Sequence, residues 1–303
     1  MWLLFAFSGP ILWAVSTHID KYLVDRYFRH SDTAVLMVFT ALIGAALLPF
    51  IAWFQPGFAA IPLSAIAVMA ASGILYMGAM LFYLRAIQQE EASVVAPFFQ
   101  VSTIFTFVLA WIFLHETIGL NRIGGGALVA AGAMSLSFDP AKRLRALKPR
   151  FVLLMLGCGL VMSVSSVLFK YFAVRDDYWI TTFWNFAGEA LFGLAILAVP
   201  KYRAQFRVLF RKSPGAVVAV NGANELINLG GGLGVRYAYL SAPVALVSAI
   251  SSTTTLFVFA FGLLLTLFFP KFGREDLSPR NLIQKASAAV FVAAGVAMMN
   301  WSR

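Results

Sequence analysis

The chain has 303 residues, of which 61% are hydrophobic and only 12% are charged, and its mean hydropathy is +0.84. A soluble domain carries about twice that fraction of charged residues, so the composition excludes an ordinary soluble protein and predicts an integral membrane protein. The net charge of +10 would favour nucleic-acid binding in a soluble protein. Here we expect Lys and Arg to lie in short cytoplasmic loops, with the lipid bilayer and not nucleic acid as the partner.

Apolar segments close to the ~20 residues that cross a bilayer follow one another along the whole chain. Ten can be drawn, over approximately residues 2–24, 32–54, 62–86, 92–115, 120–138, 151–173, 178–200, 214–238, 242–269 and 281–301. We expect an all-α integral membrane fold of ten transmembrane helices, with tight hairpins at 88–91 and 240–243. The first segment has no basic leader or cleavage site that stands out, and we expect it to be retained.

The second half of the chain repeats the first in the same order and nearly the same register. The matching pairs are residues 14–22 (AVSTHIDKY) and 163–171 (SVSSVLFKY), Ser102-Thr103 and Ser252-Thr253, and residues 129–132 and 292–295 (both VAAG). We therefore expect residues 1–147 to form a first five-helix repeat with a linker, and residues 148–303 a second. An odd number of spans per repeat inverts one repeat relative to the other, as in many secondary transporters with a central cavity.

The basic residues predict the orientation of the chain. If the loops are assigned to alternate sides of the membrane, one side carries 18 Lys and Arg residues and the other side carries 5. The positive-inside rule places the side with 18 in the cytoplasm and both termini outside.

One polar stripe interrupts the apolar pattern. Residues 219–232 read AVNGANELINLGGG, and Asn221, Asn224, Glu225 and Asn228 share one face of a helix. A carboxylate on that face would be costly in lipid, so the stripe must face protein or water. Glu225 is the foremost candidate: it could take up a proton for coupled transport, or bind a cationic or amino group. The alternative is a neutral, hydrogen-bonded structural acid.

Further candidates lie on other spans, and each has a plainer structural interpretation. Glu189 and Asn185 form an i, i+4 pair that could face the same cavity or bond to the Asn stripe, and Tyr76 and Tyr83 lie two turns apart. His18, near Lys21, could line a cytoplasmic mouth, although a lone His is more often structural. The remaining candidates are Gln100, Ser252 and Trp13. Aromatic residues in membrane helices usually pack or form belts, and hydroxyls often bond to their own helix.

Three motifs in the first half carry a family resemblance. They are Glu91-Ala-Ser-Val-Val-Ala-Pro97, Leu114-His-Glu116, and Gly124-Gly-Gly-Ala127 with Ala131-Gly132. Together with the duplication, they resemble the drug/metabolite transporter superfamily, and specifically its EamA-type ten-helix members. The chain departs from that pattern at Ser102-Thr103, where the family has a proline, and at His115, where Gly is usual. The resemblance implies export or exchange of small metabolites through a central cavity by alternating access.

The function that we expect is therefore secondary transport, most simply export of a small amphipathic metabolite such as an amino acid or amine, coupled to protons. We expect a bacterial inner-membrane protein that is a monomer or homodimer, with no cofactor, no metal and no enzymatic activity. One alternative is an exchanger or flippase for a nucleotide sugar or lipid-linked sugar. It would require basic residues in the cavity, whereas Arg85, Arg236 and Lys170 are expected at helix ends. The others are a membrane-embedded enzyme using Glu189 and Glu225, and a purely structural subunit.

Overall fold

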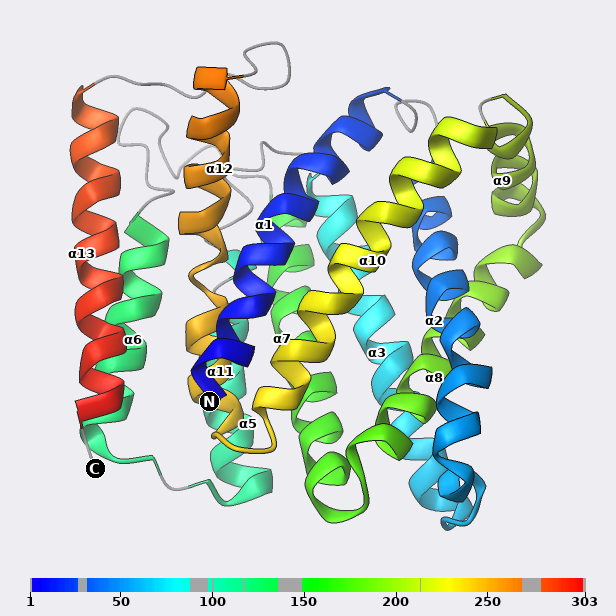
Figure 1. Cartoon of the computed structure of the whole chain (residues 1–303), viewed down its shortest axis with the longest axis horizontal. Coiled ribbons are helices and arrows are strands. Elements are labelled where there is room, and N and C mark those ends of the chain that lie inside the picture. Colours follow the sequence, from blue (N-terminus) through cyan, green and yellow to red (C-terminus); the bar gives the residue numbers. More distant parts are fainter. Residues whose placement is uncertain are drawn as a thin grey trace.

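The computed structural model describes residues 2–26, 32–87, 98–99, 101–116, 118–135, 149–212, 214–268 and 279–301. Within these ranges the regular elements are all helical, and the long helices stand side by side (Figure 1). The helices are α1 (Trp2–Arg26), α2 (Ala34–Phe54), the short 3-10 helix η1 (Pro56–Ala59), α3 (Leu63–Ile87), α5 (Val101–Leu114), α6 (Leu120–Ser135), α7 (Pro149–Arg175), α8 (Tyr178–Ala198), α9 (Pro200–Lys212), α10 (Pro214–Ala238), α11 (Val244–Ser251), α12 (Thr254–Phe268) and α13 (Pro279–Trp301).

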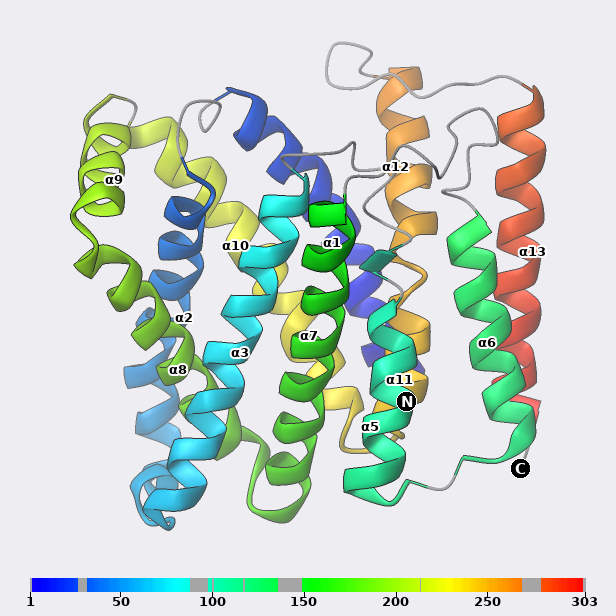
Figure 2. The same ribbon diagram turned by 180° about the vertical axis from the view of Figure 1, so that it is seen from behind.

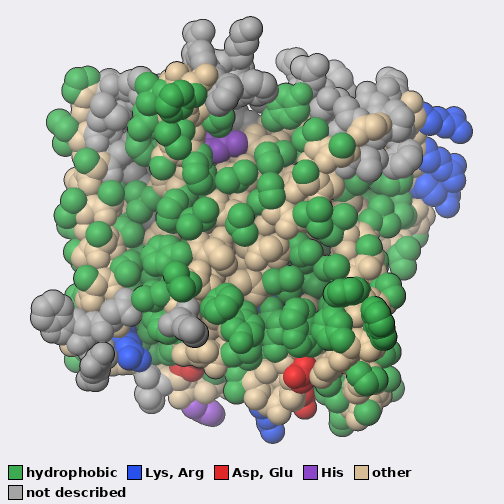
Figure 3. All heavy atoms as spheres, in the orientation of Figure 1, with side chains coloured by type: hydrophobic (Ala, Val, Ile, Leu, Met, Phe, Trp, Pro, Cys, Tyr) green, Lys and Arg blue, Asp and Glu red, His purple; other side chains and the backbone are tan. Residues whose placement is uncertain are grey.

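The length and apolar character of these helices confirm a multi-pass integral membrane protein. Among the described residues, six segments are long and apolar enough to cross a bilayer, and α5 and residues 286–299 are shorter apolar helices. The outer surface is apolar across most of its height, and the charged side chains that are visible gather near its upper and lower edges (Figure 3). Such a belt suits contact with lipid tails.

The structure differs from the expected spans in two places. The expected helix over residues 242–269 is broken at Ser252-Thr253, between α11 and α12. The Ser252 hydroxyl donates to the Ala249 carbonyl at 2.6 Å, and the Thr253 hydroxyl donates to the Ile250 carbonyl at 2.7 Å. Hydroxyls that bond to their own backbone carbonyls compete with the regular helical pattern, which accounts for a local break.

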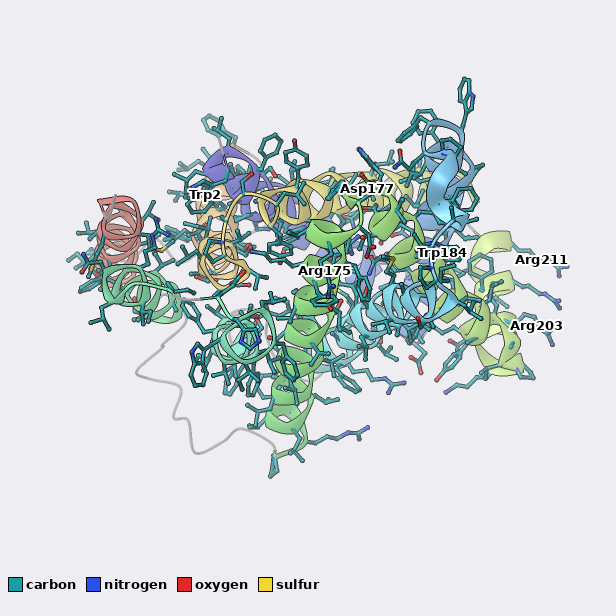
Figure 4. All side chains as sticks on the ribbon, turned by 90° about the horizontal axis from the view of Figure 1, so that it is seen from below. Trp2, Arg175, Asp177, Trp184, Arg203 and Arg211 are labelled. Carbon is teal, nitrogen blue, oxygen red and sulfur yellow. The ribbon has the colours of Figure 1, made fainter. Side chains whose placement is uncertain are left out.

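The second difference is α9, because residues 201–212 were expected to be a basic loop. Tyr202, Phe206 and Leu209 recur at helical spacing and pack against α2, where the rings of Phe206 and Phe39 are 5.3 Å apart. Arg203 and Arg211 lie on the opposite face and point away from the bundle (Figure 4). An apolar face buried against the bundle makes this charged segment a helix.

Most of the strong packing joins helices from the two halves of the chain. The closest pairs are α1 with α10, α6 with α13, α3 with α7, and α2 with α8. The view from behind shows α3 beside α7 with α5 next to them (Figure 2). The pair α6 and α13 forms one edge of the molecule, and α2, α8 and α9 form the other.

Helices α3 and α8 cross so closely that neither Gly73 nor Gly188 has room for a side chain. A Cβ placed on Gly73 would overlap the Asn185 carbonyl oxygen and lie 3.0 Å from the Glu189 backbone nitrogen. A Cβ on Gly188 would overlap the Ala70 carbonyl oxygen. Small residues allow this approach in membrane helices, and the crossing holds Asn185 and Glu189 directly against α3.

We expect Gly73→Ala to lower the free energy of unfolding by about 1–3 kcal/mol, because the added methyl group must push the two backbones apart. The measurement is the thermal unfolding midpoint of the purified protein in detergent. Gly78→Ala on the same helix is the matched control, because a Cβ at that position meets nothing within 4 Å. Equal midpoints for the two variants would contradict the close crossing.

Candidate functional site

The polar stripe on α10 faces the interior of the bundle. Asn221 and Asn224 are 0% exposed and Glu225 is 7% exposed, whereas Leu226 on the outer face is exposed. Trp13 from α1 packs at the Asn228 end of the stripe. Its indole nitrogen donates to the Asn228 carbonyl at 3.4 Å. The side of α10 that lipid would not tolerate is therefore its buried side.

Two neighbouring helices supply partners for the stripe. The Asn224 amide nitrogen donates to the Asp20 carboxylate of α1 at 2.6 Å. The Thr40 hydroxyl of α2 donates to the Glu225 carboxylate at 2.9 Å. Neither Asp20 nor Thr40 was among the candidates. Asp20 carried a signal, because it is an acid at the end of an apolar segment, but Thr40 had none.

A buried ion pair joins α8 to the last turn of α10. A guanidinium nitrogen of Arg236 donates to Glu189 at 3.0 Å, and the two side chains are only 13% and 4% exposed. The guanidinium also lies over the rings of Tyr76, Phe169 and Phe186, at 5.3, 5.1 and 5.4 Å from their centroids. Ring faces attract cations, and the planar guanidinium suits both kinds of contact.

The position of Arg236 corrects the expectation of a cation that stays at a helix end. The residue is in the last turn of α10, but its side chain turns inward because Glu189 and the three rings provide a better environment than the apolar surface does. The alternative that Asn185 and Glu189 bond to the Asn stripe is also wrong. Asn185 donates to the Ser72 hydroxyl at 2.8 Å, and Glu189 binds Arg236.

The other candidates lie outside this cluster or serve packing. His18 hydrogen-bonds through Nε2 to the Val258 carbonyl of α12 at 2.9 Å. Tyr83 packs edge-on against Phe99, with ring centroids 5.5 Å apart. The Ser252 hydroxyl bonds to its own helix, as the structural interpretation predicted. Gln100 lies outside the described residues.

A second buried ion pair joins α7 to the segment after α5. The Lys170 ammonium lies 2.5 Å from Glu116 and donates to the Ala242 carbonyl at 2.7 Å. Glu116 also accepts hydrogen bonds from the Val244 backbone nitrogen, at the start of α11. Lys170 was expected to reach the membrane surface, but its side chain is only 14% exposed. A carboxylate at a helix N-terminus is well placed to hold it there.

The charges of the cluster do not balance. Arg236 is engaged by Glu189, and Lys170 by Glu116. Among the described residues, no basic side chain forms an ion pair with Asp20 or Glu225. The described residues also contain no group of three or more His, Cys, Asp and Glu that could hold a metal ion. The chemistry open to Asp20 and Glu225 is binding a proton, an ammonium group or a monovalent ion.

We expect Glu189→Leu and Arg236→Met each to cost about 3–5 kcal/mol of unfolding free energy, because each leaves one charge buried without a partner. The double variant replaces both charges with apolar side chains and should recover most of that loss. Thermal unfolding in detergent measures all three. A double variant whose loss equals the sum of the two single losses would contradict a direct pair.

Comparisons with known proteins bear on the family and the fold of the chain. The sequence profile of the EamA-like transporter family matches residues 1–138. The fold is similar to a solved crystal structure that is described only as a protein, with a TM-score of 0.68 and 16% identity, over 98% of this chain and 95% of that chain. No curated protein matches the chain. The expected resemblance is thereby confirmed, and it indicates a membrane transporter of the drug/metabolite type.

Proposed function

We propose that this chain, whose residues 1–138 match the EamA-like transporter family, is a secondary transporter that exports a small amphipathic metabolite by alternating access. The cargo class is an amino acid or related amine, and the setting is the bacterial inner membrane. The observation that carries the proposal is a polar cluster on α1 and α10 in which Glu225 is buried and Asp20 is partly buried, and neither acid has a basic partner among the described residues. An apolar bundle tolerates such carboxylates where they bind something.

The proposal includes ten membrane spans in two inverted repeats, residues 1–147 and 148–303. Helix pairing supports this symmetry. The packing of α1 on α10 corresponds, after exchange of the halves, to the packing of α7 on α3. Likewise, α5 on α7 corresponds to α12 on α1, while α2–α8 and α6–α13 each pair equivalent helices. A central site between such repeats can be exposed to either side of the membrane in turn.

The lining groups favour an amine over an anionic cargo. Asp20 and Glu225 present carboxylate oxygens, and Asn221 and Asn224 add amide groups that can donate and accept. Tyr76 lies close enough to Glu189, Arg236 and Glu225 to interact electrostatically with each of them. A phosphate-bearing cargo, such as a nucleotide sugar, would need free cations. Arg236 is buried here, but Glu189 already occupies its guanidinium.

Coupling to protons is assigned to Glu225. Its carboxyl group lies at the centre of the stripe and keeps one oxygen outside the bond with Thr40. A carboxylic acid in that position can release a proton when the amine binds and regain it on the return step. The alternation would then require either the cargo or the proton to be present before the transporter changes state.

We expect Glu225→Gln to abolish pH-gradient-driven transport of an amine in proteoliposomes, because an amide cannot exchange the proton. The measurement is uptake of a radiolabelled amine or amino acid panel with and without an imposed pH gradient. Asp176→Asn, the same change at an exposed acid between α7 and α8, is the matched control and should leave transport unchanged. Retention of gradient-driven transport by folded Glu225→Gln would refute the coupling.

A further inference from the structure

The amide oxygens beside Asp20 lack partners. The Asn224 amide nitrogen donates a hydrogen bond to Asp20. The Asn224 Oδ1 atom is a buried acceptor that has no hydrogen bond. One turn earlier on the same face, Asn221 is fully buried and neither its Nδ2 nor its Oδ1 has a partner. An unsatisfied buried amide group costs about 1–3 kcal/mol. Two such groups lie on the helix face that carries Glu225, and one of them bonds to Asp20, so the geometry points to a binding site.

The free atoms share one chemistry. The Asn224 and Asn221 side-chain oxygens are acceptors, and each carboxylate keeps one oxygen that takes no part in its bond with Asn224 or Thr40. Ser16 lies one turn before Asp20 on α1 and is also buried. Carboxylate, amide and hydroxyl oxygens are the ligands of hard cations, and a proton alone would not satisfy the amide oxygens.

The net charge of Asp20 and Glu225 indicates how many positive charges the bound cation carries. If Glu225 holds the coupling proton, Asp20 is the remaining carboxylate without an ion pair among the described residues. Asp20 is partly buried in an apolar bundle, where an uncompensated charge is costly and one positive charge offsets it. A divalent ion would leave the cluster with excess positive charge whenever Glu225 is protonated. The charge balance therefore favours a small monovalent cation.

We propose that Asp20, Asn221, Asn224 and Glu225 form a sodium site between α1 and α10, so that Na⁺ is a second coupling ion beside the proton. The inference rests on the proposed transport function, because it gives that same cluster a further ligand. Na⁺ binds through the Asp20 carboxylate and the side-chain oxygens of Asn221 and Asn224. It ties α1 to α10, which is one of the closest pairs joining the two halves.

The test is Na⁺ binding to the purified full-length protein without cargo, read as the thermal unfolding midpoint in NaCl against equal concentrations of KCl and choline chloride. A ligand at about 100 times its Kd should raise the midpoint by roughly 5 °C. We expect this rise in NaCl alone, its loss in Asp20→Asn, and its retention in the exposed-acid control Asp176→Asn. No Na⁺-specific rise, or an equal rise in Asp20→Asn, would overturn the proposal.

A second variant keeps the test decisive if Asp20→Asn fails to fold. Asn221→Leu removes a buried amide group that has no partner. If that amide is only an unsatisfied group, the variant should be more stable than the native chain in both salts. If it is a ligand, the variant loses the Na⁺-specific rise. A rise produced by methylammonium chloride but not by NaCl would assign the cluster to the cargo amine and overturn the sodium site.

The failure of this inference can be told apart from the failure of the proposed function. Transport is measured in proteoliposomes with an amine panel, and Na⁺ binding is measured on protein without cargo. Amine transport without Na⁺ binding would refute only the sodium site. Na⁺ binding without amine transport would support the site and refute the cargo class.

Discussion

Charge compensation inside an apolar bundle is the constraint on which the rest of this structure depends. Lipid offers no partner to a buried ion, so each charge must be matched within the protein or by something that it binds. Arg236 and Glu189 meet this requirement between α8 and α10, and Lys170 and Glu116 meet it between α7 and the end of α5. Among the described residues, the side chains that bond to Asp20 and Glu225 are neutral donors. The two ion pairs therefore differ from Asp20 and Glu225 in the charge of their partners.

The helix packing places these groups with little freedom. The glycine crossing of α3 and α8 brings Asn185 and Glu189 against Ser72 and Tyr76. Gly231 similarly lets α10 approach Trp13 of α1, since a Cβ there would lie 3.0 Å from the indole nitrogen. Close backbone approach means that the polar groups meet at hydrogen-bonding distance and leave little room for an alternative partner. The geometry of the cluster is thus set by small residues that carry no polar chemistry themselves.

Much of this architecture follows from sequence pattern, because apolar segments of membrane length and a polar stripe at 3.6-residue spacing are local signals. The helices α1, α2, α3, α7, α8 and α10 match expected ranges, and the buried face of α10 is the face that Asn221, Asn224 and Glu225 share. Partners across helices were not predictable in the same way. Thr40 is one of many hydroxyls in the chain, and Arg236 has the sequence position of a surface anchor. Only the three-dimensional arrangement brings Thr40 of α2 to Glu225 and Glu189 of α8 to Arg236.

The two classes of charge also lie at different heights. Lys170 and Glu116 are near the end of the bundle that carries the 176–177 and 239–243 turns, whereas Asp20 and Thr40 lie near the opposite ends of α1 and α2. At the first end, the pair of Lys170 and Glu116 joins α7 to the start of α11. Breaking such a pair is costly, so the described arrangement is stable at that end. Asp20 lies towards the other end and Glu225 near the middle of α10, and their described partners, Asn224 and Thr40, are neutral.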